Sequence, residues 1–260
     1  MRGRVIGSAL GLAVGFAVLA TPAGASDPNA LWHVVHDLCA VDMKVSGHPE
    51  PCLEYNRHRG YAALKDLRGK TQILLIPTAR VTGIESPKLL DAGGPNYWQA
   101  AWDARRFFEQ RAGGNAPRED IGLAINSVFG RSQNQLHIHV DCVRADVKAA
   151  LIAHAGDIRP EWKPLDVDLA GKRYRARRIE GAEIAPRDPF KLLAKESPEV
   201  RADMGRQTLA AIAVQSEGGK PGFVLLAAEG GTPSNIDGAS ETLLDHACGV
   251  LSASADQPSG

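Results

Sequence analysis

The sequence predicts an α+β fold, in which an antiparallel sheet of about five strands carries helices on one face. Three observations predict it. Two short apolar runs at 61–66 and 72–76 flank a polar turn, two strand-like runs lie at 121–126 and 135–143, and a helical pattern separates the two pairs. A chain of 260 residues can bury a large core, and we expect one domain over 26–260, with an extension from about residue 150.

Charge is balanced along the chain. The sequence holds 30 Lys plus Arg and 30 Asp plus Glu, without a block of either sign. A surface that binds nucleic acid, or a disordered tail, needs a surplus of one sign. We therefore expect no nucleic-acid partner, and a partner that binds in a local pocket.

Residues 1–25 have the pattern of a signal peptide or of an N-terminal membrane anchor. Arg2 and Arg4 precede an uncharged run over 5–20, and the small residues at 23–25 fit a cleavage site. The 16 residues of that run would span about 24 Å as a helix, which is short of the roughly 30 Å of a hydrocarbon core. Both interpretations predict export and leave the cleavage of the segment open.

Four cysteines in an exported chain predict disulfides. Of the three possible pairings we favour Cys39–Cys52 with Cys142–Cys248, because the first pair closes a short polar loop at little entropic cost. No two of them form a CxxC motif, so the pattern does not favour a zinc or redox site.

The first half of the chain contains a regular series of elements. A helical pattern over 31–38 is followed by the hairpin at 61–66 and 72–76, whose second strand ends at Pro77. A longer helix begins near Asn96 and stops at Gly113. The C-terminal half predicts further strands and a last helix, at 166–169, 174–179, 207–214, 222–228 and 240–247.

Two strands between these parts alternate strictly. In 121–126 the odd positions are large and apolar, whereas the even ones are Gly122, Ala124 and Asn126, which leaves that face low enough for a ligand. In 135–143 the even positions are apolar and the odd ones are polar or titratable. We expect a pocket on the small-residue face, beside the histidines of the second strand.

His137, His139 and Asp141 lie on one face of that second strand. Two imidazoles and a carboxylate could bind a metal ion, or one imidazole could be a nucleophile whose tautomer its neighbours fix. Hydroxyl, amide and backbone N–H donors at 130–134 precede the histidines. Donors without carboxylates suit a phosphoryl group, whose transfer depends on positioning and charge stabilisation.

The run 126–140 resembles the motif of the histidine-triad (HIT) superfamily. The resemblance rests on His137 and His139, on Asn126 eleven residues before the first of them, and on Gln133 four residues before it. Residues 64–66 and 72–77 resemble the first hairpin of that superfamily. Within it, residues 76–87, 96–106, 123–127 and 137–139, together with the exported N-terminus, are similar to the bacterial CDP-diacylglycerol pyrophosphatases.

The resemblance implies a HIT-like fold and a cofactor-free hydrolase that splits CDP-diacylglycerol into CMP and phosphatidate. It implies an exported protein at the periplasmic face of the inner membrane, or in the periplasm if the first segment is cleaved, with the membrane surface as a partner. His139 would attack the cytidylyl phosphorus, and His137 would position the phosphate and help to protonate the leaving group. The implied substrate contacts are Lys65, Asp66, Asn126, Ser132, Gln133 and Asn134.

The chain departs from the superfamily pattern at three positions. Asp141 replaces the third His and could fix the tautomer of His139, and we include it among the substrate-site residues. Gln72 takes the hairpin position that often holds a supporting His. Arg80 replaces another His, and its guanidinium could bind the distal phosphate or form a structural salt bridge.

Two alternatives stay open. A metal-dependent hydrolase could use His137, His139 and Asp141, because this spacing also resembles the metallo-β-lactamase HxHxDH pattern, although residue 142 is Cys. The second alternative is an exported protein that binds nucleotide or metal without turnover.

Overall fold

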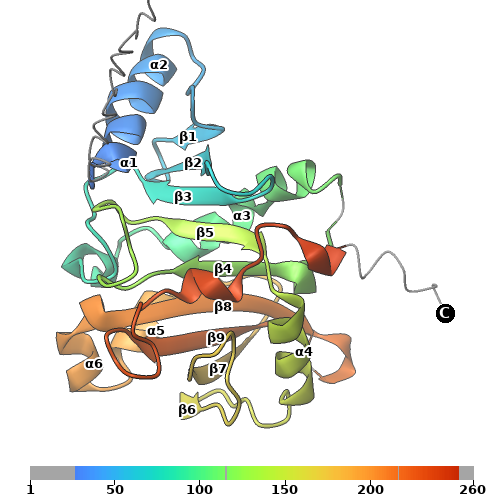
Figure 1. The fold of residues 1–260 in the computed structure, drawn as a ribbon. Coiled ribbons are helices and arrows are strands. Elements are labelled where there is room, and N and C mark those ends of the chain that lie inside the picture. The colour runs from blue at the N-terminus through green and yellow to red at the C-terminus, as the bar shows by residue number, and fades with distance from the viewer. Residues whose placement is uncertain (1–26, 115, 216, 252–260) are drawn as a thin grey trace, which may run out of the picture.

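The computed structural model of the chain describes residues 27–114, 116–215 and 217–251, so the predicted signal or anchor segment lies outside the described residues. Nine strands in this part form one antiparallel sheet (Figure 1). Their order across the sheet is β1-β2-β3-β5-β4-β8-β9-β7-β6. The strands are β1 (Glu54–Asn56), β2 (Tyr61–Lys65), β3 (Ile73–Pro77), β4 (Ile121–Ile125), β5 (Ile138–Cys142), β6 (Lys163–Pro164), β7 (Arg175–Glu180), β8 (Gln207–Gln215) and β9 (Pro221–Glu229).

The predicted α+β class is confirmed, but the sheet is wider than the five strands expected. The hairpin β8–β9 forms as predicted, and β8 pairs with β4, so the C-terminal half extends the sheet of the first half. Hydrophobic alternation identifies a strand but not its neighbour, which is why the sequence pattern did not reveal this continuation.

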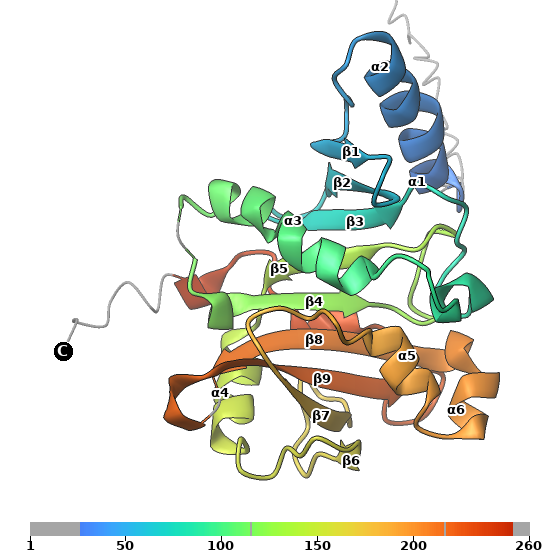
Figure 2. The same cartoon turned by 180° about the vertical axis from the view of Figure 1, so that it is seen from behind.

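One face of the sheet, the helix face, packs on α3 (Tyr97–Arg111) and α5 (Pro189–Ala194), as Figure 2 shows. The side chain of Asn96 caps α3 by accepting from the N–H of Gln99, at the predicted start of the helix. Trp98, Trp102 and Phe108 of this helix are buried against β3, β4 and β5. The aromatic residues of the predicted helix therefore belong to the core.

The opposite face carries His139, which is level with Leu74 of β3 and Ala124 of β4, and we call it the histidine face. The expectation that helices lie on one face only is wrong, because three segments cover this face. The N-terminal cover is residues 27–45, and the third segment is α4 (Ala145–Ala153). The C-terminal cover is residues 240–251, of which Leu243 and Leu244 pack on this face, whereas Cys248 and Val250 reach the core of the helix face. His139 lies between the apolar clusters that these segments form.

The N-terminal cover is one continuous helical rod whose middle turn is π-helical. It consists of α1 (Ala30–His33), η1 (Val34–Cys39) and α2 (Ala40–Val45). The sequence pattern predicts a helix over 240–247, but the structure has a 3₁₀ turn, η6 (Ser240–Leu243), and a short helical turn at 249–251. The remaining short helices are η2 (Pro87–Leu90), η3 (Arg118–Asp120), α6 (Pro198–Ala202), η4 (Met204–Arg206) and η5 (Glu217–Gly219).

Both predicted disulfides are present, Cys39–Cys52 and Cys142–Cys248. The first ties the N-terminal cover to the segment before β1, and the second ties the C-terminal cover to β5. Disulfides persist in oxidising compartments, so they indicate a location outside the cytoplasm. In the part of the chain that the structure describes, no helix has the length and apolar character to cross a membrane.

Candidate active site

His137 and His139 lie side by side at the start of β5, with ring centroids 4.9 Å apart and planes at 73°. Alternation along the strand puts both on the histidine face, while Leu136, Ile138 and Val140 join the core of the other face, as predicted. The rings are 8% and 4% exposed. Burial lowers the pKa of both histidines, and for His139 the neighbouring His137 lowers it further, so both rings are neutral at pH 7.

Gln72 and Asp66 hold one nitrogen of His139. The side-chain nitrogen of Gln72 lies 2.6 Å from Nδ1 of His139 and donates to Oδ2 of Asp66 at 2.8 Å. Nδ1 then accepts from the amide, and the ring proton is on Nε2. Nε2 is buried and has no hydrogen-bond partner among the described residues, which leaves it as the ring's available position.

His137 has the complementary tautomer. Its Nδ1–H donates to the carbonyl of Gln135 at 2.8 Å, so the lone pair of the neutral ring is on Nε2. The two histidines are therefore fixed independently, one by a backbone carbonyl and the other by a side-chain amide.

A carboxylate from the C-terminal cover faces His139. Oε2 of Glu241 lies 3.5 Å from Nε2 of His139. Asn126 fixes Glu241 from both sides, because its Nδ2 donates to Oε2 at 3.2 Å and its Oδ1 accepts from the main-chain N–H of Glu241 at 3.0 Å. Burial raises the pKa of Glu241, but attraction to His139 when that ring is protonated, together with the amides of Asn126 and Gln72, outweighs this effect and lowers the pKa.

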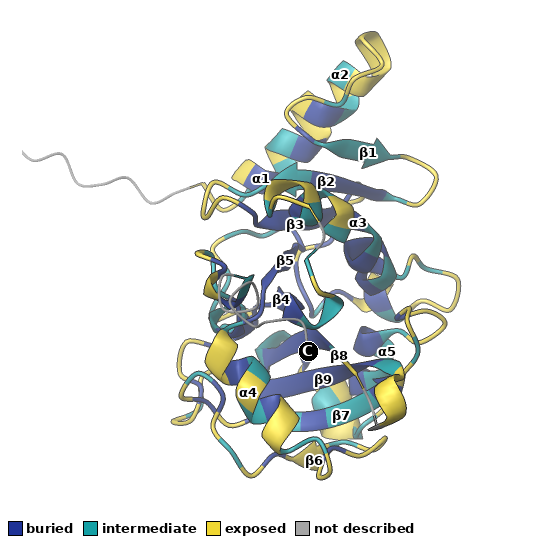
Figure 3. Cartoon of the chain, turned by 90° about the vertical axis from the view of Figure 1, so that its right-hand side faces the viewer, coloured by how far each residue is buried: buried dark blue, intermediate teal, exposed yellow. Residues whose placement is uncertain are grey.

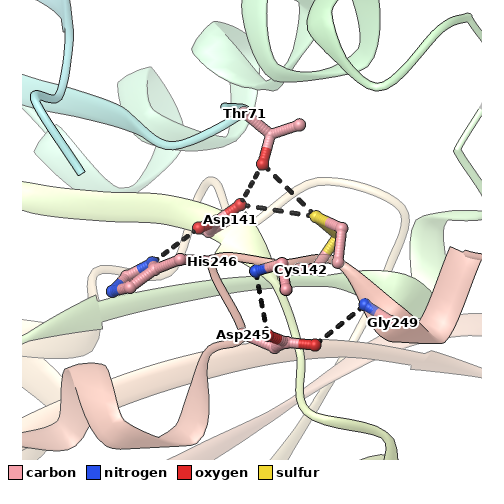
Figure 4. Close-up of a disulfide and its surroundings, with 8 residues drawn as sticks. Thr71, Asp141, Cys142, Asp245, His246 and Gly249 are labelled. Atoms are coloured by element: carbon pink, nitrogen blue, oxygen red, sulfur yellow. Dashed lines mark hydrogen bonds and ion pairs between the residues drawn. A yellow bond between two sulfur atoms is a disulfide. The ribbon is translucent and has the colours of Figure 1, made fainter. Parts of the chain in front are cut away.

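The expectation that Asp141 orients His139 is wrong. The carboxylate of Asp141 is fully buried and accepts from Thr71 at 2.7 Å and from Nδ1 of His246 at 2.9 Å, beside the Cys142–Cys248 disulfide (Figure 4). It lies two residues beyond His139 on an extended strand, roughly 7 Å along the chain, and points toward the hairpin turn and the C-terminal cover. Gln72 takes the orienting role instead. Burial raises the pKa of Asp141 despite these hydrogen bonds.

The metal site proposed for His137, His139 and Asp141 is not formed, because Asp141 points to Thr71 and His246. Asp66, His139 and Glu241 do place one ligand atom each within 4.8 Å of one another in the described part of the chain. The amide nitrogen of Gln72 lies 2.8 Å from Oδ2 of Asp66, 2.6 Å from Nδ1 of His139 and 3.4 Å from Oε1 of Glu241. Its two N–H bonds can serve the two nearer acceptors, on Asp66 and His139.

Three of the predicted phosphate contacts bind the N-terminal cover. The amide of Gln133 accepts from the N–H of Leu31 at 2.9 Å and donates to the carbonyl of Asp27 at 3.0 Å. The main-chain N–H of Asn134 donates to the carbonyl of residue 28 at 2.6 Å. Arg80 donates to the side chain of Asn29 and lies over the ring of residue 32, and it forms no salt bridge with a described residue.

Two further predicted contacts lie elsewhere. Ser132 is exposed on the loop before β5. The ammonium group of Lys65 donates to the carbonyls of Asp66, Arg68 and Gly69 and thereby holds the hairpin turn. Of the predicted site residues, the structure brings together His137, His139, Asp66 and Asn126.

The small-residue face of β4 is not open along its length. A Cβ atom on Gly122 would lie 2.6 Å from Leu244 and 2.9 Å from Ile212, so the C-terminal cover fills this position. Ala124 is fully buried in the cluster formed with α4 and β8. Small residues at 122 and 124 therefore admit the chain's own C-terminal cover, and the predicted pocket is limited to the surroundings of Asn126 and the histidines.

Sequence analysis missed Glu241 and His246. Neither belongs to a motif, and both lie about 100 residues after the histidine strand. The predicted Cys142–Cys248 disulfide could have indicated them, because a bond at Cys142 places the residues just before Cys248 beside Asp141.

The model of one protein family, described as CDP-diacylglycerol pyrophosphatase, matches residues 26–252. The chain is also 43% identical over 226 residues to a CDP-diacylglycerol pyrophosphatase of Yersinia pestis, covering 87% of this chain and 86% of the relative. The family model's match includes the hairpin, the histidine strand and the C-terminal cover. With a family model that spans most of the chain and a relative of this identity, the chain belongs to the CDP-diacylglycerol pyrophosphatase family.

Proposed function

We propose that this protein hydrolyses the pyrophosphate bond of CDP-diacylglycerol to CMP and phosphatidate through a nucleotidyl group bound to His139. Membership of the family supports the overall reaction. The observation that carries the mechanism is a pair of buried, neutral imidazoles, of which His139 has Nδ1 held by Gln72 and Nε2 without a hydrogen-bond partner in the described structure. A neutral imidazole with one nitrogen fixed and the other available is what nucleophilic catalysis requires.

In the first half-reaction, Nε2 of His139 bonds to the cytidylyl phosphorus and the bond to the phosphatidate oxygen breaks. Attack needs the lone pair on Nε2 and the proton on Nδ1. Turning the amide of Gln72 would supply this tautomer, because its carbonyl oxygen would then accept from Nδ1–H. That oxygen has no hydrogen-bond partner among the described residues. Asp66 holds the amide in its present orientation. Ribose hydroxyls that bind Asp66 would free the amide to turn, so nucleotide binding would favour the reactive tautomer of His139.

His137 would act on the leaving group. Burial keeps its ring neutral, but an anionic phosphate next to an imidazole favours the charged form. Substrate binding would therefore protonate Nε2 of His137, while Nδ1–H stays on the carbonyl of Gln135. A proton at this position can neutralise the departing phosphatidate oxygen.

We further propose that the enzyme acts on the membrane surface, at the periplasmic face of the inner membrane. The substrate class is a lipid, and the N-terminal cover projects from the body of the protein with its tip exposed (Figure 3). Leu38, Val41 and Val45 share one side of this helix and are 51%, 52% and 80% exposed. An apolar stripe of this kind suits the boundary between head groups and acyl chains.

The proposed function is tested by product analysis. Purified protein incubated with CDP-diacylglycerol should release CMP and phosphatidate, identified by phosphorus NMR or mass spectrometry, and CDP-alcohols in the same assay would define the lipid requirement. His139→Ala should abolish CMP release, and His137→Ala should slow it while leaving the nucleotidyl-enzyme detectable. If His139→Ala retained full activity and His137→Ala had none, His137 would be the nucleophile.

A metal-dependent hydrolase remains the second candidate, with a different ligand set from the one expected. Asp66, His139 and Glu241 form the group that supports it. Activity that survives exhaustive EDTA treatment would reject this candidate, and activity restored only by an added divalent cation would favour it over the covalent mechanism. A nucleotide-binding protein without turnover would give no product from any CDP ester.

A further inference from the structure

The C-terminal cover places a carboxylate and an imidazole next to His139, and the first half-reaction uses neither. Glu241 faces Nε2 of His139 at 3.5 Å, whereas Asp66 lies 4.0 Å from Nδ1, on the other side of the ring. A phosphoryl group bonded to Nε2 would therefore lie against the carboxylate of Glu241 and away from that of Asp66. Glu241 is thus the acidic group on the side where the intermediate must be hydrolysed.

The position of Glu241 is fixed by several independent contacts. Asn126 binds both its carboxylate and its main-chain N–H. The preceding Ser240 is fully buried and donates to the carbonyls of Ile125 and Leu209, which attaches the turn to β4 and β8. A side chain held this firmly, with 15% exposure, is preorganised toward the histidine.

His246 connects Glu241 to solvent. Asp141 accepts from Nδ1 of His246 at 2.9 Å, so the lone pair of the neutral ring is on Nε2, which lies 3.4 Å from Oε1 of Glu241. The imidazole is 33% exposed, compared with 15% for Glu241. The Cys142–Cys248 disulfide joins the two strands of chain that carry Asp141 and His246 (Figure 4).

We propose that Glu241 is the general base that hydrolyses the nucleotidyl-histidine, and that His246, positioned by Asp141, receives its proton. This inference rests on the proposed function. A water oxygen bonds to phosphorus, the bond from phosphorus to Nε2 of His139 breaks, and its electron pair returns to Nε2. The proton of the water passes to Glu241, then to Nε2 of His246 and to solvent, and CMP leaves.

Glu241→Gln separates the two half-reactions, because the amide keeps the shape of the side chain but accepts no proton. With CDP-diacylglycerol, rapid-quench assays should show a burst of about one phosphatidate per enzyme, followed by steady-state CMP release roughly 10²-fold slower than in the unaltered protein. Intact-protein mass spectrometry should detect a cytidylyl adduct, and His139→Ala combined with Glu241→Gln should lose it. Normal CMP release, or an equal loss of burst and steady state, would overturn the proposal.

His246→Gly tests the proton route. We expect slow steady-state turnover with a normal burst, and recovery of at least tenfold on addition of imidazole, which a purely structural role would not permit. Asp245→Asn is the matched control in the same segment, and it should keep burst and turnover. Among the described residues, its carboxylate accepts hydrogen bonds from the main-chain N–H groups of residues 247 and 249. Absence of imidazole rescue would reject the role of His246. Failure of the unaltered protein to release either product would instead reject the proposed function.

Discussion

The two covers of the histidine face have different roles, although each is tied to the body by a disulfide. The N-terminal cover meets the loop before β5 through main-chain groups that bind Gln133 and Asn134. The C-terminal cover brings ionisable side chains to the histidines, through Glu241 and His246. One cover therefore shapes the wall of the site and the other contributes to its chemistry, so the effects of altering each cover should be measurable separately.

The largest expected difference comes from removing the disulfides. Replacing Cys142 and Cys248 by Ala opens a link of sequence separation 106, whereas replacing Cys39 and Cys52 by Ala opens one of 13. Chain entropy predicts losses of about 5 and about 3 kcal/mol in the free energy of unfolding. We expect kcat to fall roughly 10²-fold in the first variant only, because Glu241 and His246 lose their tether.

Urea unfolding measures the free energy of unfolding of each double variant. CMP release, normalised to the folded fraction from circular dichroism, measures kcat. Equal kcat in the two double variants would contradict the separation of roles.

The next effect concerns the hydrogen bond that orients His139. Gln72→Leu removes the amide from Nδ1, and a bond of this kind to a charged or charging group stabilises by about 1.5–3 kcal/mol, so kcat should fall about 10- to 100-fold with little change in KM. Steady-state kinetics with CDP-diacylglycerol check this. Gln72→His restores a ring partner and should recover part of the rate, whereas an increase in KM alone would assign Gln72 to substrate binding.

A matched pair of amide variants distinguishes the role of the C-terminal cover from that of the N-terminal cover. Asn126→Ala releases Glu241 and should lower kcat about tenfold, since it removes two hydrogen bonds to that residue. Gln133→Ala releases the N-terminal cover and should lower the free energy of unfolding by about 1–2 kcal/mol with kcat changed less than about twofold. If Gln133→Ala instead raised KM strongly, this amide would contact the substrate phosphate when the substrate is bound.

The smallest effect concerns the pH dependence of stability that results from the two buried histidines. Burial lowers the pKa of His137 and His139 below the unfolded value of about 6.5. Below that pH the unfolded chain binds more protons than the folded one, so the free energy of unfolding falls as the pH decreases from 6.5. Replacing both histidines by Gln should reduce this fall by a measurable fraction between pH 7 and pH 5, in urea titrations at each pH. A decline identical to that of the unaltered protein would contradict the burial of neutral rings.

Much of the fold could be predicted because the signals were local. Alternation over 135–143 identifies β5 and its two faces, Asn96 and Gly113 mark the ends of α3, and Pro77 ends β3. The width of the sheet could not be predicted in this way. The pairing of β4 with β8 joins residues about 85 positions apart, and periodicity contains no information on such distant neighbours.

The same distinction between local and distant signals applies to the candidate site. His137 and His139 belong to a compact motif, and Asn126 has a fixed spacing from it. Asp66 was implied by the resemblance of the first hairpin to that of the superfamily. Asp141 was misassigned because the face of a strand tells where a side chain points but not which group from elsewhere will meet it there. Glu241 and His246 come from an irregular segment, where only the second disulfide indicated proximity.

The order of the cysteines has a consequence for how the protein matures. The first cysteine bonds to the second, Cys39 to Cys52, and the third bonds to the fourth, Cys142 to Cys248, so the two links neither cross nor enclose each other. A polypeptide that is oxidised progressively as it emerges into an oxidising compartment would meet the correct partner first each time. A route of this kind needs an oxidant but no exchange between disulfides, and closure of the second link ties the segment that carries His246 to β5.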